Sequence, residues 1–177
     1  KDFGVDAALK ARGLYDAATV IVAPSIIPAV EPGRLSPTSD VAALTGDAVR
    51  GANAVQACLL CHRIGEKGVD YGPALTGFAR NQTAEVVINA IINPSTDIAH
   101  GYDGSEVKLN DGTVVHGLVI GVGDPLVVQS MGGVTQMIPA DRVRSRVPLG
   151  RSLMLSAGQL GLLPRDVADI VAYLKTH

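Results

Sequence analysis

Two cysteines and a histidine stand in the order Cys-x-x-Cys-His at Cys58, Cys61 and His62, and the chain contains no other cysteine. On a helix, these three side chains would project from neighbouring positions of one face. Two thiols at this spacing can form thioether bonds to a haem while the adjacent imidazole meets its iron. The motif therefore predicts one haem c, bound covalently through Cys58 and Cys61, with His62 as a metal ligand.

Two other kinds of site also use closely spaced cysteines. A thiol redox motif of the thioredoxin type would follow a strand and begin a helix, whereas here an apolar helical pattern precedes the cysteines. A zinc site would need a second pair of ligands at short spacing, and the remaining His100, His116 and His177 are scattered along the chain. Haem attachment is the interpretation that the spacing favours, with thiol redox chemistry and metal binding as the alternatives.

The composition is that of a small folded domain with few aromatic rings. Of the 177 residues, 47% are hydrophobic but only 3% are aromatic, and tryptophan is absent. A covalently held macrocycle would supply the large apolar plate that these few rings do not. The net charge of −2 and the lack of a basic run argue against nucleic acid or an anionic membrane surface as partners. No apolar stretch reaches the ~20 residues of a membrane span.

The N-terminal part differs in pattern from the rest of the chain. Apolar residues at helical spacing predict a helix over residues 5–18, and four prolines within residues 24–37 predict a linker or an extended arm. We therefore divide the chain into residues 1–43, a helix followed by this Pro-rich segment, and a compact domain over residues 44–177. Because covalent haem attachment takes place outside the cytoplasm, we expect a periplasmic or otherwise exported protein.

Two helices are predicted at the ends of the compact domain. Residues 48–56 carry an apolar helical pattern directly into the cysteines, after an N-cap environment at residues 45–47. Gly51 lies in the middle of this helix, where glycine costs about 1 kcal/mol relative to alanine. We therefore expect another helix to approach it closely. The expected partner is a terminal helix over residues 166–175, which carries an apolar stripe.

A first helix bearing the haem motif and a last helix closing on it resemble class I cytochrome c. Between them, the segment from Tyr71 to Leu75 is similar to the Gly-Pro-x-Leu segment of that family. The resemblance implies that the carbonyl of Pro73 accepts a hydrogen bond from His62 and that Leu75 lines the haem pocket. A middle helix is predicted over residues 83–92, with Thr83 as its N-cap. The expected fold class is therefore mainly α, a class I cytochrome c helical fold around one covalent haem.

The stretch at about residues 102–147 does not belong to a minimal cytochrome. Its apolar residues alternate with a period of two, and it contains turn sequences at Asn110-Asp111-Gly112, Gly123-Asp124-Pro125 and Gly132-Gly133. We predict an inserted antiparallel β meander of four or five strands before the methionine loop. Along residues 113–122 both faces are apolar, so the insert either curls into a small barrel or packs one face on the cytochrome.

This insert makes the resemblance more specific. Four segments follow one another in the order of the Pirellula/Verrucomicrobium-type haem-binding domain, namely residues 94–102, the hairpin at 109–112, Ile138-Pro139 and Ser152-Leu153-Met154. That family usually closes large exported proteins whose upstream part resembles a sugar or alcohol dehydrogenase. The resemblance spans residues 44–176 and implies Met154 as the second axial ligand. Leu155 stands where the family commonly has a proline.

Other side chains could compete with Met154 for the iron. Met131 adjoins a glycine turn and Met137 lies in a predicted strand, where a packing role is expected. His100 lies in a loop just before the insert and is the strongest competitor. A thioether ligand raises the reduction potential relative to a second imidazole, so Met154 would suit electron transfer to an oxidising partner.

Two classes of function follow. In the first, the chain is an electron-transfer domain rather than an enzyme, and it passes single electrons from a fused or partner dehydrogenase to a respiratory acceptor. In the second, Met154 leaves the iron or never binds it, and the haem serves an enzyme or a gas or redox sensor. The sequence favours the first class, because no cluster of histidine, arginine and acidic residues lies near the expected distal loop. Arg151 is the one residue of these types there. The insert would dock a redox partner or merely cover a haem edge.

Overall fold

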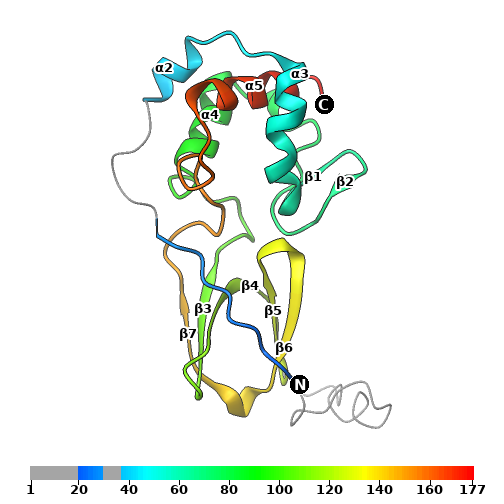
Figure 1. Cartoon of the computed structure of the whole chain (residues 1–177). Coiled ribbons are helices and arrows are strands. Elements are labelled where there is room, and N and C mark those ends of the chain that lie inside the picture. The colour runs from blue at the N-terminus through cyan, green and yellow to red at the C-terminus, as the bar shows by residue number, and fades with distance from the viewer. Residues whose placement is uncertain (1–19, 30–36) are drawn as a thin grey trace.

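The computed structural model describes residues 20–29 and 37–177 of the chain. The helix predicted over residues 5–18 therefore lies outside the described residues. Within the described part, the chain folds into two lobes, one helical and one built on a sheet (Figure 1).

The two lobes are defined here by their residues. The helical lobe comprises residues 37–104 and 149–177, and the sheet lobe comprises residues 20–29 and 105–148. The chain therefore leaves the helical lobe once, builds the sheet, and returns. The cysteine and histidine motif lies before this excursion, whereas Met154 lies just after it.

Four α-helices form the helical lobe: α2 (Thr38–Ala42), α3 (Ala48–Ala54), α4 (Ala84–Ile92) and α5 (Pro164–Leu174). Two of them begin at predicted N-caps. The Asp47 carboxylate accepts hydrogen bonds from two main-chain N–H groups in the first turn of α3, and the Thr83 hydroxyl accepts one at the start of α4. Helix α2 was not predicted, and its Val41 is buried in the core of this lobe.

Helices α3 and α5 cross in direct contact at Gly51. A Cβ built on Gly51 would lie 2.1 Å from the carbonyl oxygen of Asp169, so a side chain at this position would force the helices apart. The predicted close approach of the terminal helix is confirmed. The Asp169 carboxylate also accepts hydrogen bonds from Arg50 Nε and from the main-chain N–H of Asp47, both at 2.7 Å. The hydrogen bond from Arg50 holds the pKa of Asp169 below its usual value.

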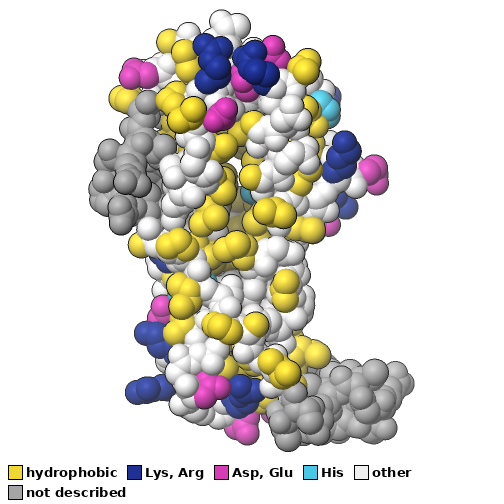
Figure 2. All heavy atoms as spheres, in the orientation of Figure 1, with side chains coloured by type: hydrophobic (Ala, Val, Ile, Leu, Met, Phe, Trp, Pro, Cys, Tyr) yellow, Lys and Arg dark blue, Asp and Glu magenta, His cyan; other side chains and the backbone are white. Residues whose placement is uncertain are grey.

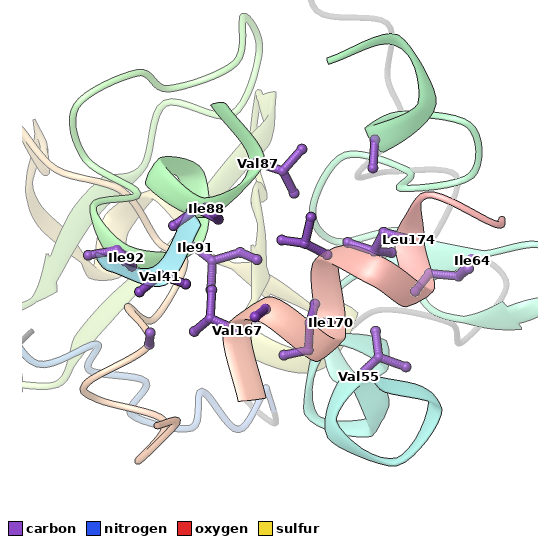
Figure 3. Packing of buried hydrophobic residues seen from close by; sticks show 14 residues of the cluster. Val41, Val55, Ile64, Val87, Ile88, Ile91, Ile92, Val167, Ile170 and Leu174 are labelled. Carbon is purple, nitrogen blue, oxygen red and sulfur yellow. The ribbon is translucent and has the colours of Figure 1, made fainter. Parts of the chain in front are cut away.

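The core of the helical lobe is aliphatic. Figure 3 shows side chains of α4 and α5 meeting Val41, Val55 and Ile64 from the surrounding elements. Each such side chain stabilises the fold by roughly 1.5–3 kcal/mol when fully buried. The two helices contribute Val87, Ile88, Ile91, Ile92, Val167, Ile170 and Leu174. This core fixes α3 against α5 and so positions the motif that follows α3.

Five strands form an antiparallel sheet in the sheet lobe: β3 (Ser105–Leu109), β4 (Val114–Val122), β5 (Leu126–Ser130), β6 (Val134–Ile138) and β7 (Val143–Pro148). Their spatial order is β6-β5-β4-β3-β7, so β3 to β6 make the predicted meander and β7 joins the free edge of β3. The three predicted turn sequences connect the four meander strands. Among the described strands, β6 and β7 do not pair with each other, so the sheet is open rather than a closed barrel.

Residues 20–29 form an extended arm that lies along the sheet. The N–H of Ser25 donates to the carbonyl of Val114 at 3.1 Å, and the carbonyl of Ser25 accepts from the N–H of His116 at 2.6 Å. The arm therefore pairs with the first half of β4. Its Val22 is buried in the core of the sheet lobe, together with Val107, Leu109, Val115, Leu126, Val128 and Ile138.

The expectation of a mainly α fold is wrong. The described residues form a mixed α/β fold, with four helices of 5 to 11 residues and a five-stranded antiparallel sheet whose strands hold 5 to 9 residues. The strands themselves were predicted, but as an addition to a helical fold. In the structure they enclose an apolar core of their own, which the arm completes, and they therefore form a lobe comparable to the helical one.

Candidate functional site

The cysteine and histidine motif lies directly after α3. There the chain tightens into the 3-10 helix η1 (Val55–Leu60), and the N–H groups of Cys61 and His62 both donate to the carbonyl of Cys58, at 3.0 and 2.8 Å. This turn places the three functional side chains next to one another. His62 is buried, whereas the two cysteines are half-buried.

A hydrogen bond fixes the orientation of the His62 ring. Its Nδ1 lies 2.7 Å from the carbonyl oxygen of Pro73. Because a carbonyl can only accept, Nδ1 carries the proton and Nε2 keeps its lone pair. Gly72 lies against the ring, since a Cβ on it would be 2.5 Å from Cε1 of His62. Burial lowers the pKa of His62 below 6.5 despite the opposing bond to Pro73, so the ring is neutral and able to bind a metal.

A short loop returns Pro73 to the histidine. After the motif, β1 (Arg63–Ile64) and β2 (Lys67–Gly68) form a two-stranded antiparallel ladder. The N–H of Gly72 then donates to the carbonyl of Cys61 at 2.6 Å, and the N–H of Leu75 donates to the carbonyl of Arg63 at 2.8 Å. These bonds tie the segment with Pro73 and Leu75 to the motif. Leu75 packs on the core of the helical lobe, as Cys58 does.

The two thiols do not form a disulfide. Burial raises the pKa of Cys58 to about 11, with a smaller contribution from Cys61. Burial likewise raises the pKa of Cys61. A thiol redox motif depends on a thiolate stabilised at neutral pH. The surroundings of Cys58 and Cys61 act in the opposite direction and therefore disfavour that chemistry.

Met154 faces the helical core while its neighbours in the chain face elsewhere. Leu153 and Leu155 pack in a cluster between the two lobes. Met154 packs instead on the core of the helical lobe, as Cys58 and Leu75 do. This alternation is typical of an extended segment. The thioether of Met154 and the thiol of Cys58 therefore both pack on the core of the helical lobe.

The helical lobe is hollowed on the face shown in Figure 2, and the visible walls of the hollow are largely hydrophobic. Several side chains that pack on the helical core are only partly buried, among them Cys58, Leu59, Leu75, Phe78 and Met154. They offer apolar surface together with a thiol and a thioether. Partly open apolar side chains of this kind suit a large apolar group that contains a metal more than they suit a polar substrate.

The other methionines and His100 lie away from this core. Met131 lies in the turn between β5 and β6, Met137 lies in β6, and each is 37% exposed. His100 is an exposed loop residue. None of the three packs on the helical core, which favours Met154 as the partner of His62.

The two remaining histidines are engaged in other contacts. His116 is buried, its Nδ1 accepts a hydrogen bond from the N–H of Ile27 at 3.0 Å, and its Nε2 lies 3.2 Å from the carboxylate of Glu106. His177 stacks on the ring of Tyr173. In residues 20–29 and 37–177, no group of three or more His, Cys, Asp or Glu side chains could hold a metal ion. The zinc alternative therefore has no ligand set in the part that the structure describes.

A buried hydroxyl adjoins the motif. Tyr71 is 4% exposed, and its hydroxyl forms no hydrogen bond with a described protein group. Burial, with a smaller contribution from Cys61, raises the pKa of Tyr71, so the hydroxyl stays a proton donor. Buried hydroxyls normally have an acceptor, and a polar substituent of a bound group would supply one. The sequence does not distinguish Tyr71 from a tyrosine that merely packs.

The sheet lobe covers the Cys61 side of the motif. Leu118 of β4 packs in the same cluster as Cys61. At the tip of the β5–β6 hairpin, the main-chain N–H of Gly132 lowers the pKa of Cys61, against the larger effect of burial. Next to it, Gln129 Nε2 donates to the carbonyl of Asp70 at 3.4 Å. The insert therefore packs on the helical lobe beside the thiols.

The residues present fit a covalently bound haem. Two half-buried thiols are available for thioether bonds, and a neutral imidazole presents Nε2 to a metal. The partly buried apolar side chains on the helical core would receive the macrocycle, and the Tyr71 hydroxyl would gain an acceptor.

No family model and no curated protein matches the sequence of this chain. Among the described residues, no helix combines the length and the apolar character needed to cross a membrane.

Proposed function

We propose that the chain is a one-electron carrier with a single haem c, bound through Cys58 and Cys61 and ligated by His62 and Met154. The observation that carries this proposal is the 2.7 Å hydrogen bond between His62 Nδ1 and the carbonyl of Pro73. It fixes a buried, neutral imidazole with Nε2 unprotonated, beside two thiols at the attachment spacing. When bound, the haem supplies the ferric–ferrous couple.

The residues of the chain would hold the haem rather than react with a substrate. His62, oriented by Pro73, and the thioether of Met154 would hold the iron. Leu75 and the other partly buried apolar side chains on the helical core would exclude water. A thioether ligand favours ferrous iron and raises the reduction potential. No acid, base or nucleophile is required, so the chain acts as an electron-transfer domain and not as an enzyme.

The order of the motifs supports a setting for this activity. It resembles class I cytochromes c, and most closely the Pirellula/Verrucomicrobium-type haem-binding domain. By that resemblance, a fused or partner dehydrogenase supplies the electrons and a respiratory acceptor takes them up. The protein would work in the periplasm or elsewhere outside the cytoplasm, where covalent haem attachment takes place.

The ligand set can be tested with Met154→Ala, using Met131→Ala and Met137→Ala as controls. We expect Met154→Ala alone to lose the weak far-red absorption band of methionine-ligated ferric haem. Its reduction potential should fall by about a tenth of a volt or more, within the range of roughly 0.8 V that axial ligands span. Persistence of the band in Met154→Ala would refute the ligand assignment. A wild-type protein with an open sixth position would instead support a haem enzyme or sensor.

A further inference from the structure

The extended arm, residues 20–29, contacts the segment that carries Met154. Arg151 donates from Nη1 to the carbonyl of Pro28 at 3.1 Å and from Nη2 to the carbonyl of Ile27. Gln159 donates from Nε2 to the carbonyl of Pro28 at 2.9 Å. Two donors, one on each side of Met154 in the chain, therefore hold the same end of the arm.

The arm is itself anchored on the sheet. The N–H of Ile27 donates to Nδ1 of His116 at 3.0 Å, and Ser25 pairs with β4. Further along, the N–H of Ala23 donates to the side chain of Gln136 at 2.8 Å. The carbonyls that receive Arg151 are therefore fixed relative to the sheet lobe.

Apolar packing acts on the same segment. Ile27 is 1% exposed and belongs to the cluster that contains Leu153 and Leu155, the two neighbours of Met154. Because these two leucines face the arm and the sheet, Met154 is directed to the opposite side, toward the helical core. The Met154 N–H also donates to the Ser152 hydroxyl at 3.0 Å, which restrains the main chain there.

Resting on the His/Met ligation proposed above, we infer that the arm is a clasp that holds Met154 on the iron, and that Arg151 is its positioning residue. Arg151 forms no ion pair with a described carboxylate, so its guanidinium fork acts on the two arm carbonyls. The clasp lies outside the compact domain predicted over residues 44–177. How firmly Met154 stays on the iron thus depends on the arm, a segment that precedes the haem motif.

The clasp can be tested in the full-length, haem-loaded ferric protein with imidazole as the probe. External imidazole binds the iron only after the Met154 thioether has left it, so the association rate reports how often the loop opens. We expect Arg151→Gln to raise this rate roughly tenfold or more, since charge-assisted hydrogen bonds are lost. Arg151→Lys keeps the charge without the fork and should fall between wild type and Arg151→Gln.

A matched control is available at the other end of the arm. Arg142 Nη1 donates to the carbonyl of Val20 at 2.7 Å, so Arg142→Gln also removes a guanidinium donor to the arm, but away from the methionine loop. Its imidazole rate should equal that of the wild type. Gln159→Ala removes the second donor to Pro28 and should raise the rate even if Arg151→Gln fails to fold.

The outcomes separate this inference from the proposed function. A wild-type protein without the far-red band would refute methionine ligation, and the clasp with it. A wild-type protein with the band, together with wild-type imidazole rates in both Arg151→Gln and Gln159→Ala, would overturn the clasp and leave the ligand assignment intact. An equal rise in Arg142→Gln would also overturn it, because general loosening of the arm would then explain the effect.

Discussion

The sheet lobe closes its core with protein alone, whereas the helical lobe leaves many of its apolar side chains partly open. In the sheet lobe, Val107, Val115, Val128 and Ile138 have no exposed surface, and the arm covers the remaining side. In the helical lobe, the partly buried side chains packed on the core include both a candidate attachment site, Cys58, and the candidate ligand Met154. The open core is thus the one that contains the candidate site.

This difference indicates a division of labour between the lobes. Apolar surface left accessible beside thiols and a neutral imidazole is favourable only when another apolar group covers it. The sheet lobe needs no such group and can act as a rigid support. The sheet lobe contacts the candidate site at two places. The tip of the β5–β6 hairpin lies beside Cys61, and the arm accepts a hydrogen bond from Arg151. The two lobes should therefore differ in their dependence on haem.

The largest effect is expected when both attachment cysteines are removed. Cys58→Ala/Cys61→Ala should abolish covalent haem binding, and the helical lobe should lose the group that completes its core. We expect amide hydrogen exchange in α3 and α5 to accelerate by roughly a hundredfold or more, the effect of losing a tightly bound ligand. Exchange in β4 and β5 should change little, because the sheet core is closed without haem.

The wild-type holoprotein, prepared identically, is the reference for this experiment. Equal loss of protection against hydrogen exchange in both lobes would show that they form one cooperative unit. The sheet lobe would then depend on haem as much as the helical lobe does. Covalent haem retained in the double variant would refute attachment through Cys58 and Cys61.

A smaller effect is expected from a single methyl group between α3 and α5. Gly51→Ala places a Cβ 2.1 Å from the carbonyl of Asp169. Alanine would gain about 1 kcal/mol in an isolated helix, but overpacking costs up to about 3 kcal/mol, so we expect a net loss of roughly 2 kcal/mol in the free energy of unfolding. Urea unfolding of the haem-loaded protein, followed by helical circular dichroism, would measure it.

The sheet lobe offers a matched glycine. A Cβ on Gly123, in the turn between β4 and β5, would meet no atom within 4 Å. Gly123→Ala should therefore change the free energy of unfolding by less than about 0.5 kcal/mol. A neutral Gly51→Ala would mean that α3 and α5 are farther apart than in the structure.

Gly51 also shows what could be predicted from the sequence. Its unfavourable place in a helix signalled a close contact, and the caps at Asp47 and Thr83 marked where helices begin. These signals are local, because they depend on residue types a few positions apart. Pro73 was found through a resemblance to a known segment, and the structure places its carbonyl on His62. Turn sequences likewise located three of the strand connections.

The clasp and the second core could not be predicted in this way. Arg151 and Ile27 are 124 positions apart, and the acceptors on the arm are main-chain carbonyls, which almost any sequence could supply. No side-chain pattern therefore marks the arm as a partner of the methionine loop. The fold class was misjudged for a related reason, since alternation along the strands does not reveal that a distant arm completes their core.

The smallest expected effect concerns the Tyr71 hydroxyl, which meets no described protein acceptor. If a polar substituent of the haem accepts its hydrogen bond, Tyr71→Phe should destabilise the holoprotein by about 1 kcal/mol. In the haem-free Cys58→Ala/Cys61→Ala background, the same change should be neutral or stabilising, because it removes an unsatisfied buried group.

Tyr102→Phe, at a partly exposed tyrosine of the same cluster, is the control and should be neutral in both backgrounds. Thermal unfolding of the six proteins, the parent and the two variants in each background, gives the comparison. Equal effects of Tyr71→Phe with and without haem would mean that the hydroxyl plays no part in binding it, and that the helical lobe depends on haem through apolar contacts and iron ligation alone.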